Sequence, residues 1–177
     1  MNVTHRPAVV LCGPMGSGKT SVGRRLAASL GVALRDTDED VVAAAGRTIP
    51  EIFAAEGEAG FRELEHRAVV AALQDHTGVL SLGGGAVVHA GTRRALAQYR
   101  RGGGVVIYLE VSQRDAMRRI GADQNRPLLA GTESPARRWA RIMTERRGLY
   151  QEVATHEVST HHRSPARVAA VILDTLG

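Results

Sequence analysis

The octet GPMGSGKT at residues 13–20 has the residue types and the spacing of a phosphate-binding loop. Gly13 and Gly18 permit backbone conformations in which successive N–H groups face one anion. Lys19 can reach the outer phosphates of a nucleoside triphosphate, and Thr20 offers a hydroxyl to a Mg²⁺ ion that bridges them. An apolar strand pattern precedes the octet and a helical pattern follows it, as the motif requires. The sequence therefore predicts triphosphate and Mg²⁺ binding, but the loop alone does not separate kinases from GTPases and other ATPases.

Lys19 is the single lysine of a chain whose other basic residues are all arginine. Genome base composition accounts for the arginines but not for a lysine at this position. A loop packed against phosphate has room for a compact ammonium on a thin stem and not for a broad planar guanidinium. With no second lysine, the chain also lacks the N-K-x-D motif that reads guanine, which argues against a GTPase.

Carboxylates and glycines follow two further strand patterns. Asp36 and Asp38 end one of them, and the triplet GGG at residues 83–85 ends another. Ligands collect at the carboxyl ends of strands in an open parallel sheet. One carboxylate can therefore hold Mg²⁺ while the other orients a substrate hydroxyl toward the γ-phosphate. The alternative interpretations are a helix cap at Asp38 and a plain flexible loop at the glycines.

Arg62 and Glu65 lie three residues apart in a helical pattern, so they face the same side of the helix. One interpretation is a surface salt bridge, which contributes little to stability. The functional interpretation is an arginine, steadied by a glutamate, that grips an anionic substrate. Combined with the phosphate loop, these features predict ATP bound beside a small hydroxylated anion.

The composition limits the other functions that the chain could have. The formal charge is +5 with a pI near 10.3, but the arginines are scattered and aromatic residues make up only 3%. No stacking platform for nucleic acid is therefore expected. The one cysteine, Cys12, excludes an internal disulfide. No apolar run approaches the ~18 residues of a membrane helix, and no signal-peptide core is present, so we expect a cytoplasmic protein without a membrane partner.

Strand and helix patterns alternate along the chain and predict a three-layer α/β/α fold with a five-stranded, mainly parallel sheet. Residues 48–51 and the pair Ser112 and Asp115 have capping-box spacing. Residues 121–133 lack an apolar period and carry Arg126, and a loop of this length in a compact domain is usually functional. The expected strands are 8–12, 32–35, 79–82, 105–109 and 157–159, and the expected helices are 20–30, 41–45, 58–74, 92–99, 112–120, 135–150 and 165–176.

The combined motifs resemble the shikimate kinase family, within the nucleoside-monophosphate-kinase-like P-loop proteins. The resemblance covers nearly the whole chain in order, through GPMGSGKT, DTD, IFAAEGEAGFRELE, LSLGGGAV, NRPLL and ERRGLY. Many families share the phosphate loop, whereas the combination of the other motifs is far more specific. The resemblance implies a single P-loop kinase domain over residues 1–177, with a substrate-binding helical segment at about 38–74 and a mobile lid at about 121–134. It also implies a monomer that binds ATP or ADP and shikimate.

The resemblance assigns the acceptor side of the site residue by residue. Asp38 is implied to bind shikimate hydroxyls and to accept the reacting proton. Arg62 and Arg146 are implied to hold the shikimate carboxylate, and Glu65 to orient the arginine. Gly84 and its neighbours Gly83 and Gly85 are implied to contact the ring.

The nucleotide side is assigned in the same way. Thr20 and Asp36 are implied to organise Mg²⁺, and Lys19, Asp38 and Arg126 are the implied catalytic residues, with Arg126 on the closing lid. Arg119 and the Arg163–Pro165 stretch match positions that sandwich adenine. The full expected ATP-binding set is Gly16, Ser17, Gly18, Lys19, Thr20, Ser21, Arg119, Arg126, Arg163 and Pro165.

The expected activity is transfer of the γ-phosphoryl group of ATP to the 3-hydroxyl of shikimate, a step of aromatic amino acid and chorismate biosynthesis. A kinase for gluconate or another sugar acid is the alternative within kinases, and the two arginines with DTD and GGG favour shikimate. A nucleotide-dependent binding protein without phosphoryl transfer is the alternative from another class. The complete set Lys19, Asp36, Asp38 and Arg126 argues against it.

Overall fold

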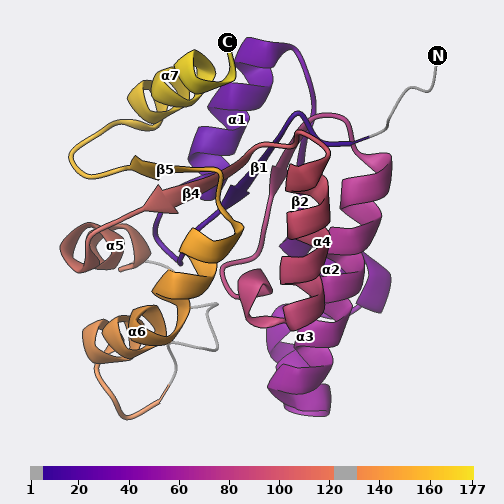
Figure 1. Ribbon diagram of the computed structural model, residues 1–177. Helices are drawn as coiled ribbons and strands as arrows, with labels where there is room; N and C mark the ends of the chain where they lie inside the picture. Colours follow the sequence, from indigo (N-terminus) through magenta and orange to yellow (C-terminus); the bar gives the residue numbers. More distant parts are fainter. Residues whose placement is uncertain (1–5, 122–130) are drawn as a thin grey trace.

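The computed structural model describes residues 6–121 and 131–177 (Figure 1). The strands are β1 (Val9–Cys12), β2 (Leu34–Asp36), β3 (Val79–Ser81), β4 (Val106–Glu110) and β5 (His156–Ser159). The helices are α1 (Lys19–Leu30), α2 (Thr37–Ala45), α3 (Ile49–Asp75), α4 (Ala90–Arg101), α5 (Gln113–Ile120), α6 (Pro135–Val153) and α7 (Pro165–Leu176), with a 3-10 helix η1 (Ala86–Val88) before α4.

The five strands form one sheet in the order β2-β3-β1-β4-β5, and every pair of neighbours is parallel. Alternate side chains of a strand point to opposite faces of its sheet. Val9 and Leu11 accordingly pack against α1 and α7, whereas Val10 and Cys12 pack on the other face with α3, α4, α5 and α6. The predicted three-layer architecture is confirmed, and the sheet is parallel throughout the part of the chain that is described.

The segment α2–α3 forms a small body at one end of the sheet with an apolar cluster of its own, around Val41, Ile52 and Phe61 (Figure 1). Its second helix begins with the predicted capping box, in which Thr48 and Glu51 bond each other's backbone N–H groups. The helix breaks at Gly57, whose φ of 69° and ψ of −175° are not helical. A side chain would strain this conformation, so the glycine lets the chain turn before the long arm of α3.

The carboxyl ends of the strands lie along one edge of the sheet, and the middle strand β1 leads into the phosphate loop. Asp36 is paired with Ser81, and Leu11 is paired with Ser81 from the other side, so the ends of β2, β3 and β1 are in register. Most of the expected lid at 121–134, with Arg126, lies outside the described residues. Among the described residues, no helix is long and apolar enough to cross a membrane.

Candidate active site

The phosphate loop joins β1 to α1 through glycines with left-handed backbone angles. Gly16 has a φ of 81° and Gly18 a φ of 87°, and Gly18 is the residue that caps α1. No side chain among the described residues caps the helix. The first N–H groups of α1 therefore have no side-chain acceptor, and with the helix dipole they favour an anion at this point.

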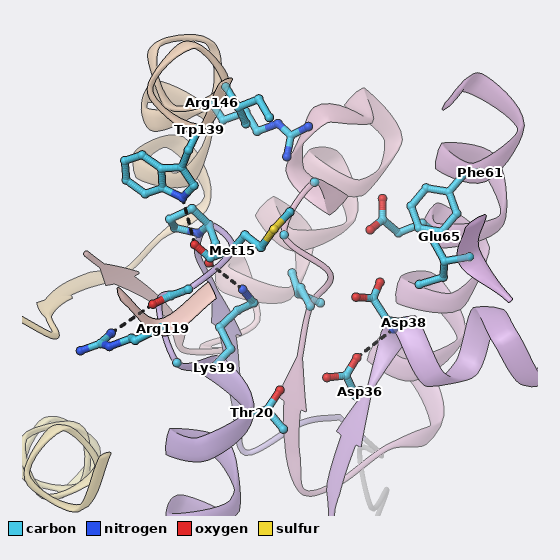
Figure 2. A pocket seen from close by; sticks show the side chains of 18 of the residues that line it. Met15, Lys19, Thr20, Asp36, Asp38, Phe61, Glu65, Arg119, Trp139 and Arg146 are labelled. Atoms are coloured by element: carbon cyan, nitrogen blue, oxygen red, sulfur yellow. Dashed lines mark hydrogen bonds between the residues drawn. The ribbon is translucent and has the colours of Figure 1, made fainter. Parts of the chain in front are cut away.

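Side chains from three parts of the chain bind the carbonyl oxygens of this loop. Lys19 Nζ donates to the carbonyls of residues 13 and 14 at 2.8 and 3.1 Å. Trp139 Nε1 on α6 donates to the carbonyl of residue 15 at 3.0 Å, and Arg119 on α5 donates to that of residue 16 at 3.1 Å (Figure 2). These donors offset the partial negative charge of the loop's carbonyl oxygens, which would otherwise repel a phosphate.

The DTD triplet begins α2 and ties it to the glycine triplet. Asp36 Oδ1 accepts the N–H of Asp38 at 2.9 Å and caps the helix, so the alternative interpretation placed the cap two residues too late. The hydroxyl of Thr37 accepts the N–H of Gly83 at 2.9 Å. This cap extends α2 back to residue 37, four residues before the predicted start. Asp38 is left in the first turn with its carboxylate directed into the pocket (Figure 2).

Arg62 and Glu65 form a buried ion pair, so the surface interpretation is wrong. Arg62 Nη1 lies 2.5 Å from Glu65 Oε2, and the two residues are only 6% and 1% exposed. Burial raises the pKa of Glu65 to about 7, although Arg62 opposes the shift. Among the described residues Arg62 Nε has no hydrogen-bond partner. A buried donor of this kind suits an anionic ligand.

The glycine triplet makes room for these charged side chains. A Cβ at Gly85 would lie 2.2 Å from Arg62 Nη2, and one at Gly83 would lie 2.3 Å from Glu65 Oε1 and 2.5 Å from Asp38 Oδ1. A Cβ at Gly84 would meet nothing closer than 3.5 Å. The triplet is therefore a packed shelf and not a plain flexible loop. Gly84 and Gly85 line the pocket, whereas Gly83 supports the carboxylates behind it.

Arg146 closes the pocket from α6. It is 7% exposed, and Figure 2 shows its guanidinium directed into the pocket, as the carboxylate of Asp38 is. The neighbouring Tyr150 is fully buried and stacks on Tyr108 at 5.1 Å between ring centroids. Its hydroxyl donates to the carbonyl of Gly84, so the glycine shelf and the helix that carries Arg146 are joined.

These elements surround one cavity of about 520 Å³, a size that suits small-molecule ligands. Apolar side chains that the sequence interpretation missed form part of its wall, including Ile49, Phe53, Phe61 and Trp139. A compositional signal existed, because the chain has two phenylalanines and one tryptophan and all three line this cavity. The predicted residues that line it are Gly16, Gly18, Lys19, Thr20, Ser21, Asp36, Asp38, Arg62, Glu65, Gly84, Gly85, Arg119 and Arg146.

A few predicted residues are not part of the cavity lining. Ser17 is fully buried beside Gly13 and is not among the residues that line the cavity. Arg163 and Pro165 do not line the cavity, and Arg163 donates to the carbonyl of Ser159 at 3.2 Å. Arg126 lies outside the described residues.

Known proteins share this sequence and this arrangement. A family model described as shikimate kinase matches residues 15–177. A shikimate kinase of Streptomyces avermitilis is 51% identical over 170 residues, which are 96% of this chain and 95% of that protein. The chain belongs to the shikimate kinase family.

Solved structures agree with membership of the shikimate kinase family. A shikimate kinase from Acinetobacter baumannii, in complex with shikimate, superposes with a TM-score of 0.89 and 37% identity over 98% of this chain and 93% of that one. A gluconokinase from Sinorhizobium meliloti has a TM-score of 0.62 at 18% identity, over 99% of this chain and 93% of that one. The second likeness is one of fold alone.

Proposed function

We propose that the protein transfers the γ-phosphoryl group of ATP to the 3-hydroxyl of shikimate and forms shikimate 3-phosphate and ADP. One observation carries the proposal within the shikimate kinase family. A single pocket is lined by the phosphate loop on one side and by Arg62, Arg146 and Asp38 on the other, and the side chains of Arg146 and Asp38 point into it (Figure 2). That pairing suits a triphosphate beside an acid that carries hydroxyl groups.

On the donor side, the chain supplies backbone N–H groups and positive charge. Lys19 would balance charge on the outer phosphates, and the N-terminus of α1 would hold the others. The hydroxyl of Thr20 and the carboxylate of Asp36 are the hard oxygen donors that suit Mg²⁺, and both line the pocket. When bound by these residues, Mg²⁺ would reduce the negative charge of the phosphates that must transfer or leave.

On the acceptor side, Arg62 and Arg146 would bind the carboxylate of shikimate as planar forks. Asp38 would orient the 3-hydroxyl and accept its proton as the new O–P bond forms and ADP leaves. The apolar wall with Ile49 and Phe53 would exclude water from the acceptor. Exclusion matters because water in the place of the hydroxyl would hydrolyse ATP.

Arg126 and the adenine-binding residues rest on the family resemblance. Arg126 would reach the phosphates from the lid, and Arg119 would face adenine together with the Arg163–Pro165 stretch. The carbonyl of Thr160 supports the second assignment, because it accepts both Arg119 Nη2 at 3.1 Å and the N–H of Arg163 at 3.2 Å.

A coupled assay of ADP release tests the proposal directly. The acceptors are shikimate, gluconate and none, each with ATP and Mg²⁺. We expect rapid ADP release with shikimate and little with the other two. Release that shikimate does not accelerate would refute the proposal, and faster release with gluconate would favour the alternative kinase.

A variant of Arg62 separates the acceptor site from the donor site. Arg62→Ala should weaken shikimate binding roughly 10- to 100-fold, because hydrogen bonds to a charged group are lost, and should leave ATP binding nearly unchanged. Titration calorimetry with each ligand measures both affinities. Arg67→Ala is the matched control, since Arg67 is an exposed arginine of the same helix. Equal losses for both ligands would contradict the assignment of Arg62.

Folding of residues 1–177 as one domain, the monomeric state and the cytoplasmic location stay predictions. Sedimentation velocity of the full chain with ATP and shikimate checks the monomer. A single species at the mass of one chain, 18.9 kDa, is the expected result.

A further inference from the structure

A second group of ligating side chains lies beside the nucleotide half of the pocket. Asp115 of α5 and the pair His161 and His162, which follow β5, bring one possible ligand atom each within 4.8 Å of one another. Asp115 is 1% exposed, whereas both histidines are exposed. None of the three lines the pocket or takes part in the proposed reaction.

The two oxygens of the Asp115 carboxylate contact different side chains, an arginine and a histidine. Arg118 Nη2 lies 3.0 Å from Oδ1, and His161 Nδ1 lies 2.7 Å from Oδ2. Ser112 caps α5 through the N–H of Asp115, but the side chain of Asp115 contacts the histidine loop. Oδ1 is thus held by the arginine, while Oδ2 accepts the Nδ1–H of His161, and the carboxylate also accepts the backbone N–H of His162. A metal ion at Oδ2 would replace the proton that this oxygen now shares with the imidazole.

His162 completes the cluster in a conformation that a non-glycine residue seldom adopts. Its φ is 51°, and its ring centroid lies 3.8 Å from that of His161. No hydrogen bond to its ring nitrogens is found within residues 6–121 and 131–177. Histidine is among the few non-glycine residues that adopt this region readily. The left-handed backbone brings a second imidazole close to the same carboxylate.

We infer that Asp115, His161 and His162 form a binding site for a first-row transition-metal ion such as Zn²⁺. Two imidazoles and one carboxylate are a donor set that suits Zn²⁺ and its neighbours, whereas Mg²⁺ prefers oxygen ligands alone. Ligand atoms of a tetrahedral Zn²⁺ site lie about 3.3 Å apart. The exposed imidazoles can rotate to reach that spacing, while the buried carboxylate stays in place.

The site is joined to the phosphate loop through one arginine. Arg119 donates to both oxygens of Thr160, at 3.0 and 3.1 Å, and to the loop carbonyl of Gly16. Thr160 directly precedes the two histidines, and Arg119 follows Asp115 by one helical turn. A bound ion would therefore fix the loop that Arg119 contacts. This coupling, unlike the ion site itself, rests on the proposed use of ATP.

Calorimetric titration of the tag-free full chain with Zn²⁺, without nucleotide, tests the site. We expect one ion per chain. The variants His161→Asn and His162→Asn should each lose at least tenfold in affinity for the ion, since changes around metal sites typically cost this much. His156→Asn removes an exposed imidazole of β5 outside the cluster and should bind as the parent does. No saturable binding, or equal affinity in the His162 variant, would overturn the inference. So would loss of binding in a His66→Asn/His89→Asn variant, whose stacked rings are the other histidine pair.

Thermal unfolding and kinetics give two further readouts. An ion that binds only the folded chain raises Tm, by roughly 5–10 °C at a hundredfold excess over its Kd, and EDTA should reverse the shift. The shift should disappear in His162→Asn, whose Tm without metal should match the parent because the residue is exposed. Zn²⁺ should also change the KM for ATP and not that for shikimate, and only with His162 present. An unchanged KM for ATP would refute the coupling, while the ion site is decided by the titration.

Discussion

The donor side of the pocket consists mainly of backbone groups, whereas the acceptor side consists mainly of charged side chains. On the donor side, eight consecutive residues supply a loop of backbone groups that protein donors neutralise from behind. On the acceptor side, charged side chains come from α2, α3 and α6 and pack against a glycine shelf after β3. In the proposed reaction a short local motif would bind phosphate, whereas residues more than 100 positions apart would bind the acceptor acid. The first kind of site is common to many functions, and the second would give this pocket its specificity.

The largest expected effect comes from a variant of Asp38, which is proposed to take the proton of the acceptor hydroxyl during phosphoryl transfer. Asp38→Asn keeps the shape of the side chain but cannot accept the proton of the hydroxyl. We expect kcat to fall by about 10³-fold, within the range for loss of a general base, with the KM for ATP nearly unchanged. Circular dichroism should show a folded chain. Near-normal turnover would remove Asp38 from its proposed role.

The next effect tests whether the donor side depends on shape as well as charge. Lys19→Arg keeps the positive charge but places a planar fork where Nζ now contacts two loop carbonyls. We expect kcat/KM for ATP to fall by about 10²-fold because the phosphates are displaced. Arg35→Lys, a change of the same pair of residue types outside the pocket lining, is the control. Full activity of the Lys19 variant would leave the lone lysine without a structural explanation.

The glycine shelf gives a matched pair of variants on the acceptor side. Gly85→Ala would put a methyl group onto the guanidinium of Arg62, whereas Gly84→Ala meets its nearest atom at 3.5 Å, an ordinary contact. Overpacking of a buried site costs about 1–3 kcal/mol, so Tm should fall by roughly 3–10 °C for Gly85→Ala. Gly84→Ala should unfold close to the parent. Equal melting temperatures of the two variants would show that the shelf is not packed as described.

The smallest effect concerns the buried ion pair of Arg62 and Glu65. Burial raises the pKa of Glu65 to about 7 from an ordinary value of 4.5, so the folded state holds this proton more tightly than the unfolded chain. The contribution of Glu65 to the free energy of unfolding is therefore fully present below pH 4.5 and is lost as the pH rises through about 7. Glu65→Gln should flatten the fall of Tm between pH 5 and 8 by a few degrees. Glu63→Gln, in an exposed position of the same helix, should leave the slope unchanged.

The contrast between the two sides also explains what could be predicted from the sequence. The five-stranded, mainly parallel sheet and the capping box at Thr48 follow from local patterns, and both are confirmed, whereas the order of the strands in the sheet was not predicted. The DTD and GGG triplets were placed at strand ends, but their contacts depend on packing between segments. No pattern along the chain indicates that Gly83 and Gly85 exist to accommodate charged groups from α2 and α3.

Long-range contacts account for the residues that sequence reasoning missed. Thr37, Trp139 and Tyr150 each hold a backbone group in a distant loop, at Gly83, Met15 and Gly84. Such a role leaves no local motif, because any residue with a donor or acceptor of the right length would fit the pattern. For Trp139 and Tyr150, the available sequence signal was that aromatic residues are rare in this chain, at 3% of its residues.

The strand order β2-β3-β1-β4-β5 has a consequence for how such proteins can diversify. Most of the acceptor residues follow β2 and β3, on one flank of the central strand, and the contacts with the expected adenine side follow β4 and β5 on the other (Figure 1). The two flanks are not independent, because one apolar cluster joins Val69 of α3 and Leu80 of β3 to Tyr108 of β4 and Met143 of α6. Arg146 also comes from α6, so a change of the acid that the pocket accepts would involve residues from both flanks of the central strand.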